Sequence, residues 1–487
     1  MRTTIPERGR SNEELLQALR ELRSSDTNWR EGRVFSLVYF GGDRHEELLE
    51  SAHALFAPTN ALNPIAFPSL RRMEAEVVEM AADLFHGPSS AVGTMTSGGT
   101  ESIFLAVATY RDKARKERPW VLRPEIVAPS TVHPAFDKAG HYLGVSIRRV
   151  PVGVDFRADV SRMGRAVGPR TIAIVGSAPQ YPHGLVDPIE ALSTLARRKG
   201  LPLHVDACVG GFVLPWLERL GRNIDRWDFR VEGVSSISAD LHKYGYAAKG
   251  ASLLIWRDMD FMRHQFYVAT EWPGGIYASA TAAGTRPGGP IAAAWAGLRG
   301  FGEDGYLAAA RQSLNAADRL RAGVRAIPGL RLIGDSVATI VTWGAAANGP
   351  DVFAVADALE RRGWSVDRQQ RPACVHLTVT RNHVEAADSY LADLRASVEE
   401  VRANPALARS GTAPMYGMMA KVPIRGLVKS SVKKVMEAMY APGAKSADVN
   451  AAKGDGLIDR MIDRHGESIE QALDRVERLR KRLGFGG

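Results

Sequence analysis

The sequence predicts an α/β fold: a mostly parallel, seven-stranded sheet covered by helices, with a small α+β domain towards the C-terminus. Three observations predict it. The middle of the chain alternates short apolar runs with helix-like segments, a pattern typical of parallel sheets with helices on both faces. Glycine-rich and polar motifs directly follow several apolar runs, where ligands bind in such sheets. After about Tyr306 the pattern changes to a smaller set of helices and strands.

The expected elements can be placed along the chain. The apolar runs that predict strands of the large sheet are 92–96, 125–129, 146–152, 171–176, 203–206, 235–239 and 252–256. Helices are expected between several of them, for example over 103–116 and over 187–199, where Gly200 ends the helical pattern. Towards the C-terminus, the sequence predicts strands at 330–333, 338–341 and 374–380, and helices at 351–362 and 384–403.

These elements suggest four parts. They are an N-terminal helical arm (1–60), a large domain (61–305), a small C-terminal domain (306–441) and a helical tail (442–487). In the tail, apolar residues at helical spacing over 457–483 predict an amphipathic helix or helix pair. We expect it to pack against the core or in a dimer, which is the common fate of such helices.

Composition sets broad limits. Of 487 residues, 45% are hydrophobic and 24% charged, which is ordinary for a soluble globular protein. The only cysteines, Cys208 and Cys374, are far apart in sequence, which argues against a disulfide framework and favours the reducing cytoplasm. We expect no metal and no nucleic-acid partner, because neither zinc-site spacing nor a nucleic-acid motif is present. No apolar signal or membrane-spanning run is visible. The net charge of +9 suits an anionic substrate or an anionic membrane surface, or has no specific meaning.

The most informative segment is Ser-Ala-Asp-Leu-His-Lys-Tyr-Gly at 238–245. It places Lys243 directly after His242, at the end of an apolar, strand-like run. Such a lysine suits a Schiff base to pyridoxal phosphate (PLP), a cofactor that stabilises carbanions. Alone the signal is weak, since most lysines are solvated charges, but three upstream segments strengthen it.

The first of these is Thr-Ser-Gly-Gly-Thr-Glu-Ser at 96–102, between an apolar run and a helical pattern. Free backbone N–H groups at a helix start attract a phosphate, and glycines let it come close. The hydroxyl of Thr100 adds a donor. An ordinary capped turn is the alternative, because glycine-rich turns are a pattern of low specificity.

The other two segments lie further along the chain. Asp206 interrupts the buried-strand pattern of 203–211, and a buried carboxylate needs a partner. The ring nitrogen of PLP is one such partner, and a helix cap or structural salt bridge is the alternative. His133, in 130–136, either stacks on the cofactor ring or caps a short helix.

Together these motifs resemble the fold-type I, PLP-dependent group II decarboxylase family, and within it the sphingosine-1-phosphate lyases. The matching stretches are TSGGTES, HVDACVGGF, SISADLHKYGYAAKG, WPGGIYAS and GTRPGG, in family order between about Arg33 and Ala420. Eukaryotic members carry a membrane anchor, which we do not find in this sequence. The chain therefore resembles a soluble, bacterial-type member, and we expect it in the cytoplasm.

The resemblance implies roles for the cofactor residues. Lys243 would form the Schiff base, Asp206 would pair with the ring nitrogen, and His133 would stack on the ring. Residues implied to hold the cofactor phosphate are Gly99, Thr100 and His242. The resemblance further implies a homodimer with shared active sites, in which Gly284 and Thr285 approach that phosphate from the other subunit.

It also implies a substrate pocket. Lys249 would contact the substrate phosphate, and the residues implied to line the pocket are Tyr39, Tyr181, Tyr416 and Cys208. Asn63 stands where many lyases of the family place a phosphate-binding histidine. Asparagine brings a hydrogen bond without a positive charge, so a shorter phosphorylated amino alcohol is an alternative to the sphingoid base phosphate.

The activity implied by the resemblance is retro-aldol cleavage of the Cα–Cβ bond of a phosphorylated long-chain sphingoid base such as sphingosine 1-phosphate. The products would be a fatty aldehyde and ethanolamine phosphate. A lipid substrate adds the expectation of transient contact with a membrane surface. The released Lys243 amine is a candidate base, because a lysine pKa falls in a cationic site of low dielectric. The alternatives are a PLP-dependent amino-acid decarboxylase, which breaks the bond to the carboxylate, and a non-catalytic PLP binder.

Overall fold

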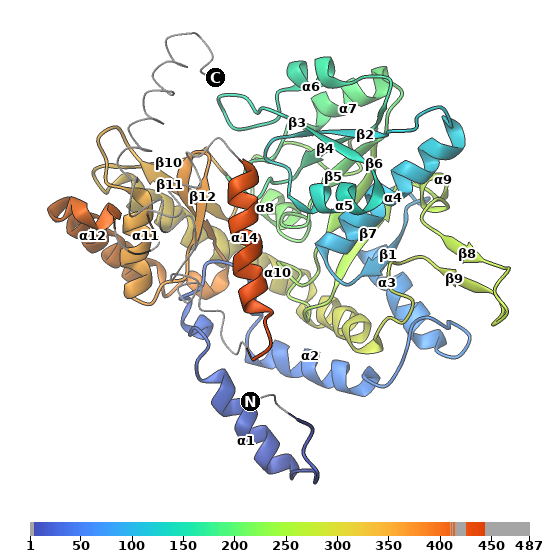
Figure 1. Ribbon diagram of the computed structural model, residues 1–487, viewed down its shortest axis with the longest axis horizontal. Coiled ribbons are helices and arrows are strands. Elements are labelled where there is room, and N and C mark those ends of the chain that lie inside the picture. The colour runs from blue at the N-terminus through green and yellow to red at the C-terminus, as the bar shows by residue number, and fades with distance from the viewer. Residues whose placement is uncertain (1–3, 410, 412, 414–424, 444–487) are drawn as a thin grey trace.

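A computed structural model of the chain describes residues 4–409, 411, 413 and 425–443 (Figure 1). Its central sheet has seven strands in the order β1-β7-β6-β5-β4-β2-β3. The strands are β1 (Val92–Thr96), β2 (Glu125–Pro129), β3 (Ser146–Val150), β4 (Thr171–Ser177), β5 (Leu203–Asp206), β6 (Val234–Ala239) and β7 (Ser252–Trp256). Only β7 runs antiparallel to its neighbours in this sheet. The predicted mostly parallel, seven-stranded sheet is confirmed.

In the large sheet, the strand boundary that differs most from the prediction is the end of β3, and in the second sheet β11 begins two residues later and ends four residues later than predicted. The sequence predicted a strand to residue 152, but β3 ends at Val150. Pro151 follows, and a proline has no N–H to donate to a neighbouring strand. The proline therefore ends the pairing although Val152 continues the apolar pattern.

Helices cover both faces of this sheet. Helices α4 (Gly99–Glu117) and α5 (Ala135–Leu143) pack on one face, in a core cluster that includes Ile103 and Phe136. The other face forms a cluster with residues of α3 (Pro68–Leu84), α6 (Val160–Ala166), α7 (Ile189–Arg198) and α8 (Leu214–Arg219). A short helix, α9 (Met259–Met262), follows β7. Burial on both faces explains the apolar runs of β2, β4 and β7, whereas the edge strand β3 contains two arginines and is partly exposed.

A second, antiparallel sheet has the order β10-β11-β13-β12. Its strands are β10 (Leu330–Leu332), β11 (Ile340–Ala345), β12 (Asp367–Gln370) and β13 (Ala373–Thr378). This sheet contributes to a separate hydrophobic core around Trp343, Trp364 and Tyr390. The helices of this part are α11 (Val352–Arg361), α12 (Ala387–Ala403), η2 (Arg381–His383) and η3 (Pro405–Arg409). Strand β12 was not predicted, because Asp-Arg-Gln-Gln has no apolar alternation.

Helix α10 (Gly288–Arg325) spans the predicted boundary between the large and small domains. It bends at Gly302, whose φ of 64° and ψ of 172° are not helical and favour glycine. The N-terminal part contains α1 (Asn12–Arg23), η1 (Trp29–Glu31) and α2 (Asp43–Phe56). Helix α1 extends away from the rest of the chain (Figure 1), whereas Phe35 is fully buried in the core of the second sheet.

Two further elements complete the described chain. The hairpin β8 (Tyr267–Ala269) and β9 (Tyr277–Ser279) projects from the side of the large sheet, and α14 (Arg425–Met439) lies near the C-terminal end (Figure 1). The predicted helix or helix pair at 457–483 lies outside the described residues. Within the described part, no helix combines the length and apolar character that crossing a bilayer needs. No group of three or more His, Cys, Asp or Glu side chains is arranged there to hold a metal.

The core around β4 generates a stability prediction. Ile174 is fully buried in this strand, so we expect Ile174→Ala to lower the free energy of unfolding by about 2–5 kcal/mol. Leu122, which is 87% exposed, is the control, and Leu122→Ala should change the free energy of unfolding by less than about 0.5 kcal/mol. Denaturant unfolding measures both, and equal effects of the two substitutions would contradict this packing.

Candidate functional site

Polar residues gather where the parallel strands end. Asp206 is the last residue of β5 and Ser177 the last of β4, and the two lie side by side in the sheet. On its other side Asp206 pairs with Ser238 of β6, and the loop after β6 carries Asp240 and Lys243. Since carboxyl ends of parallel strands share one edge, residues distant in sequence meet here.

Lys243 forms an ion pair that the sequence interpretation did not include. Its Nζ donates to Oδ2 of Asp240 at 2.9 Å. Burial lowers the pKa of Lys243, but the negative groups around it, Asp240 first, outweigh burial and hold the pKa above the ordinary 10.5. The predicted fall in pKa concerns Lys243 after its release from the cofactor, and it stays a prediction. The prediction assumed cationic surroundings, whereas the surroundings are anionic.

The loop that carries Lys243 is held at several points. The hydroxyl of Tyr244 donates to the carbonyl of Val379 at 2.7 Å, and that of Tyr306 donates to the carbonyl of Gly245 at 2.7 Å. A ring nitrogen of His45 lies 2.8 Å from the carbonyl oxygen of Tyr246. These bonds satisfy buried carbonyls and fix the backbone from which the lysine projects.

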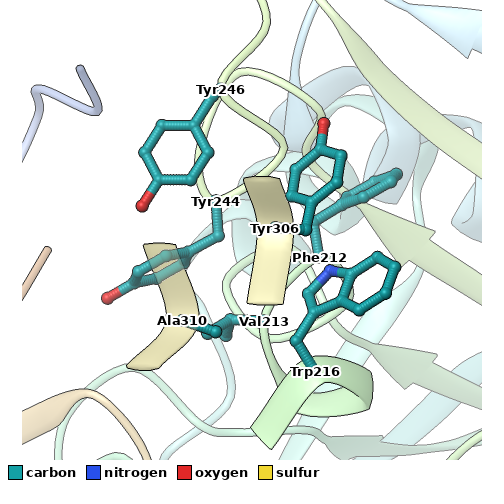
Figure 2. Close-up of a pocket in the computed structure, with 7 residues that line it drawn as sticks. All are labelled: Phe212, Val213, Trp216, Tyr244, Tyr246, Tyr306 and Ala310. Carbon is teal, nitrogen blue, oxygen red and sulfur yellow. The ribbon is translucent and has the colours of Figure 1, made fainter. Parts of the chain in front are cut away.

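Aromatic rings back this loop (Figure 2). Tyr244, Tyr246, Tyr306 and Trp216 line a narrow gap together with Phe212, and the rings of Trp216 and Tyr306 stack with centroids 5.3 Å apart. The gap has no room for a water-sized group. We therefore assign it to packing behind Lys243 and not to ligand binding.

Asp206 is buried and held by its neighbours. Its Oδ1 accepts a hydrogen bond from the backbone N–H of Cys208 at 3.1 Å and one from Ser238 Oγ at 3.4 Å. The same Ser238 hydroxyl lies 3.2 Å from Nε2 of His204, whose Nδ1 lies 2.7 Å from Ser236 Oγ. A buried polar chain thus fixes the carboxylate behind the site. Burial lowers the pKa of His204 to about 4, so its ring is neutral at physiological pH.

The glycine-rich turn forms the start of α4. Gly98 precedes the helix, and the first N–H groups of a helix have no acceptor within it. A Cβ atom at Gly99 would lie 2.7 Å from both Asp240 Oδ1 and Cys208 Sγ, so only glycine fits there. Thr100 is exposed on the first turn. This geometry suits a phosphate, because the helix dipole and the free N–H groups attract an anion.

His242 lies beside the turn, and His133 lies near Asp206 and Lys243. Nδ1 of His242 accepts a hydrogen bond from the N–H of Ala251 at 3.3 Å, and burial lowers the pKa of this histidine. A neutral ring that accepts at Nδ1 carries its proton on Nε2, and this Nε2 lies 3.7 Å from Oδ2 of Asp240. His133 Nδ1 accepts a hydrogen bond from the N–H of Ala135, the first residue of α5, at 3.2 Å. Burial lowers the pKa of His133 as well, against the opposing charge of Asp206.

Two buried hydroxyls at the same edge have no hydrogen-bond partner among the described residues. They belong to Ser177, which ends β4 beside Asp206, and to Thr131, which follows β2. Buried polar groups in native proteins are normally bonded, so unpartnered hydroxyls indicate a place for a polar ligand. Together with the close approach at Gly99, they show that these residues fit a phosphorylated, polar cofactor such as PLP.

Tyr39 and Lys249 lie together near Lys243. The ammonium of Lys249 sits 5.3 Å from the centre of the Tyr39 ring and donates to the carbonyl of Leu37 at 2.7 Å. Burial lowers the pKa of Lys249, and the positive charge of Lys243 lowers it further. Burial raises the pKa of Tyr39, and the nearby groups Tyr181 and Asp240 raise it further. This cationic and aromatic pair suits an anionic group of a substrate.

Tyr181 contacts a carboxylate that the sequence did not single out. Its hydroxyl donates to Oδ2 of Asp367 at 2.6 Å, and its ring stacks on His376 with centroids 4.2 Å apart. Burial raises the pKa of Tyr181, and the charge of Asp367 raises it further, so the phenol stays protonated. Since the phenol proton is directed to Asp367, the phenol oxygen remains an acceptor for a substrate hydroxyl.

The remaining predicted residues are placed differently. Cys208 is buried beside Asp206, and its Sγ donates to Ser238 Oγ at 3.4 Å. Asn63 is exposed and its Oδ1 accepts from the backbone N–H groups of Ile65 and Ala66, which stabilises a local turn. Tyr416 lies outside the described residues.

Gly284 and Thr285 occupy a surface segment of this chain. Thr285 is exposed, and its Oγ1 accepts a hydrogen bond from Asn60 Nδ2 at 3.3 Å. The same segment is anchored by Arg286, whose guanidinium donates to Oε1 of Glu74 at 2.6 Å. Contacts within the chain thus hold the segment at the surface, where another molecule can reach it.

Sequence reasoning missed Asp240, the polar chain behind Asp206, and Asp367. Asp240 carried a usable signal, because it ends an apolar strand run in the same way as Asp206. The contact between Tyr181 and Asp367 had none, since the two residues are 186 positions apart. The hydrogen bonds of His204 depend on strand order, which the apolar pattern does not specify.

Comparison with known proteins agrees with this geometry. Residues 1–344 match the family described as the pyridoxal-dependent decarboxylase conserved domain. The solved structure of Lactobacillus brevis glutamate decarboxylase has a TM-score of 0.72 at 22% identity, covers 82% of this chain and 95% of that one, and shares the fold. The fold and this family match identify a pyridoxal-dependent enzyme, and its cofactor is PLP.

Proteins that are more similar to this chain show which group within this family it belongs to. A sphingosine-1-phosphate lyase of Arabidopsis thaliana is 44% identical over 88% of this chain and 79% of that protein. A probable sphingosine-1-phosphate lyase of Legionella pneumophila is 33% identical over 86% of this chain and 72% of that protein. The solved sphingosine-1-phosphate lyase of Burkholderia pseudomallei has a TM-score of 0.82 at 38% identity and covers 90% of this chain and 97% of that one. The chain belongs to the sphingosine-1-phosphate lyase family.

The glycine-rich turn generates a prediction. A methyl group at position 99 would collide with Asp240 and Cys208 and displace the phosphate site. We expect Gly99→Ala to weaken PLP binding at least about tenfold, or about 1.4 kcal/mol. Absorbance titration of the cofactor-free protein measures the affinity. The matched control is Gly168→Ala, since a Cβ there meets nothing within 4 Å. Equal PLP affinity in both variants would rule out this turn as the phosphate site.

Proposed function

We propose that this chain is a PLP-dependent aldehyde-lyase that cleaves the Cα–Cβ bond of phosphorylated long-chain sphingoid bases by retro-aldol chemistry. The observation that carries the proposal is the placement of Lys243, Asp206, His242 and the α4 turn at one edge of the sheet in a member of this family. Lyase relatives over most of the chain favour this activity over amino-acid decarboxylation.

The cofactor residues have complementary tasks in this proposal. PLP supplies an electron sink for the pair released when a bond to Cα breaks. Lys243 attaches the cofactor covalently, and Asp206 holds the ring nitrogen protonated, because a fixed buried carboxylate stabilises that charge. The N–H groups at Gly99 and Thr100 and the Nε2–H of His242 bind the phosphate. His133 covers the ring face while its Nδ1 stays bonded to Ala135.

In this proposal Lys249, which lies near Lys243 and Tyr39, binds the substrate phosphate. Tyr181 orients the 3-hydroxyl, because its own proton is directed to Asp367 and its oxygen is left to accept. Tyr39, Tyr416 and Cys208 complete the lining. Asn63 adds at most a hydrogen bond near the phosphate, since its oxygen already serves the turn at 65–66.

A homodimer with shared sites accounts for the surface around Gly284 and Thr285. The adjacent β8–β9 hairpin exposes Tyr267, Trp272 and Ile276, by 63%, 59% and 78%. Contiguous exposed apolar side chains of this kind mark contact surfaces. We propose that this segment reaches the partner subunit and places Gly284 and Thr285 at its cofactor phosphate.

Location and membrane contact are part of the same proposal. Both cysteines are free and buried, which supports a reducing, cytoplasmic setting. The net charge of +9 supports transient contact with an anionic membrane surface, from which a lipid substrate would be drawn.

The activity can be tested directly. We expect the purified enzyme with PLP to convert sphingosine 1-phosphate into a long-chain aldehyde and ethanolamine phosphate in equal amounts, measured by mass spectrometry. Intact sphingosine 1-phosphate together with carbon dioxide release from an amino acid would favour the decarboxylase alternative. Cleavage of a shorter phosphorylated amino alcohol alone would retain the chemistry and reject the long-chain substrate.

Lys243 generates a second prediction. Lys243→Ala removes the covalent attachment of PLP, so kcat should fall at least about a thousandfold. The circular dichroism spectrum should stay unchanged, because the alanine side chain fits wherever lysine does. Lys138→Ala, at an exposed lysine of α5, is the control and should keep full activity. Substantial turnover in Lys243→Ala would overturn the assignment.

Lys249 generates a third prediction. Lys249→Met keeps the aliphatic stem and removes the charge, so KM for sphingosine 1-phosphate should rise about 10- to 100-fold, the cost of a lost charged hydrogen bond. The kcat value should change much less. Steady-state kinetics separate the two, and an unchanged KM would show that the substrate phosphate binds elsewhere.

A further inference from the structure

Asp240 is a buried charge that the proposed reaction does not use. Its side chain is 3% exposed, and it follows β6 directly, three residues before Lys243. Asp206, the proposed partner of the ring nitrogen, is a separate carboxylate with its own donors, Ser238 and Cys208. The site therefore contains two buried carboxylates, and the one in contact with the lysine is Asp240.

A chain of hydroxyl groups fixes Asp240 from behind. Ser252 Oγ donates to Asp240 Oδ1 at 2.6 Å. Ser252 Oγ lies 2.9 Å from Ser102 Oγ, which lies 2.7 Å from Thr96 Oγ1. A carboxylate only accepts, so Ser252 donates its proton to Asp240, whereas Thr96 Oγ1 also donates to the carbonyl of Gly98 at 3.3 Å. The direct hydrogen bond from Ser252, in β7, favours the charged form of this carboxylate, and Ser102 and Thr96 hold the Ser252 hydroxyl in place.

The start of α4 favours the same charge. A Cβ at Gly99, the first residue of α4, would lie 2.7 Å from Asp240 Oδ1, so the carboxylate packs against the positive end of this helix. The other carboxylate oxygen, Oδ2, is the acceptor for Lys243 Nζ. An ionised Asp240 held in this way offers the lysine a fixed, desolvated counter-charge.

We propose that Asp240 is a positioning residue that holds the Lys243 side chain as an ammonium ion whenever the lysine is not bonded to the cofactor. It thereby sets the pH range in which the lysine captures PLP. The inference rests on the proposed function, because it takes Lys243 as the point of cofactor attachment. It adds a reason why this loop carries a second carboxylate in addition to Asp206.

The capture step follows ordinary imine chemistry. The ammonium of Lys243 first loses one proton to solvent. The Nζ lone pair then attacks the aldehyde carbon of PLP, a C=N bond forms, and the aldehyde oxygen leaves as water with the two protons of the amine. Only the neutral amine reacts, so a counter-charge that favours the ammonium slows capture at neutral pH and holds the free lysine in place.

Other charged and titratable groups act on this pair. Four segments around the pair supply these groups. The loop after β6 supplies His242 and Lys249, and the end of β5 with the residues after it supplies Asp206 and Cys208. The segment after β2 supplies His133, and the N-terminal segment supplies Tyr39. Burial lowers the pKa of the Asp240-bound lysine, and Asp240 is the first of the groups that raise it. Removing the Asp240 charge leaves burial in place, so the pKa of Lys243 should fall.

The test measures the pH dependence of PLP capture by the full-length, cofactor-free protein. Absorbance follows capture, and borohydride reduction with peptide mapping locates the bond. In Asp240→Asn the amide oxygen still accepts from Ser252, but the counter-charge is gone. We expect the midpoint of the pH–rate profile to move to lower pH. Capture at pH 7 should become at least about tenfold faster, because a fall of one unit in the lysine pKa raises the neutral fraction of the amine about tenfold. Asp225→Asn removes a carboxylate that pairs with Arg157 instead of Lys243, and should keep the wild-type midpoint.

The outcomes separate two failures. If Asp240→Asn captures PLP at Lys243 with the wild-type midpoint, or with a midpoint at higher pH, the inference is wrong and the proposed function stands. If peptide mapping finds PLP on another lysine, the proposed function itself fails. A purely structural role of Asp240 would lower stability without moving the midpoint.

A second measurement covers the case in which Asp240→Asn does not fold. Competitive labelling of wild-type, cofactor-free protein with acetic anhydride compares the titration of Lys243 with that of the exposed Lys138. We expect Lys243 to titrate at higher pH than Lys138. Titration of Lys243 below Lys138 would overturn the inference.

Discussion

The site depends on one constraint: the parallel strands β2, β4, β5 and β6 end at a common edge, and charges placed there are buried. Asp206 and Asp240 follow neighbouring strands, so the sheet brings two carboxylates into one low-dielectric region. Buried charges are costly unless they are paired and hydrogen-bonded. Each carboxylate accordingly has its own support. Asp206 has a backbone N–H and a serine linked to His204, while Asp240 has a chain of hydroxyls, a helix start and Lys243. The donors differ, and so do the tasks we assign to the two residues.

This arrangement explains why the surroundings of Lys243 are anionic, whereas other parts of the site are suited to binding anions. The glycine turn and the neutral His242 present N–H donors beyond the carboxylates, and Lys249 and Tyr39 form a cationic and aromatic pair near Lys243. A phosphorylated, positively charged ring fits between these regions, because its ring nitrogen and its phosphate need opposite partners. A substrate with an amine and a phosphate needs the same combination at a second place. The packed aromatic layer behind Tyr244 keeps the lysine loop rigid, so the partners stay in position (Figure 2).

Much of this could be predicted from the sequence, for physical reasons. Strands buried on both faces contain apolar runs, which made β2, β4 and β7 visible in the sequence, and in the large sheet only Pro151 shifted a boundary noticeably. Motifs that interrupt apolar runs identified Lys243, Asp206 and the glycine turn. The polar strand β12 and the contact of Tyr181 with Asp367 were not predictable, because they depend on how distant segments pack. The raised pKa of Lys243 was not predictable for a related reason. Opposing contributions decide it, and the largest opposing one, from Asp240, depends on an interatomic distance.

The central claim is that Lys243 and Asp206 hold the two ends of one PLP ring at the edge of the large sheet. The most direct measurement is a crystal structure of the enzyme with PLP bound. The account predicts electron density continuous with Nζ of Lys243, and a ring nitrogen within hydrogen-bond distance, about 3 Å, of the Asp206 carboxylate. A cofactor bonded to a different lysine, or a ring nitrogen that faces away from Asp206, would contradict it.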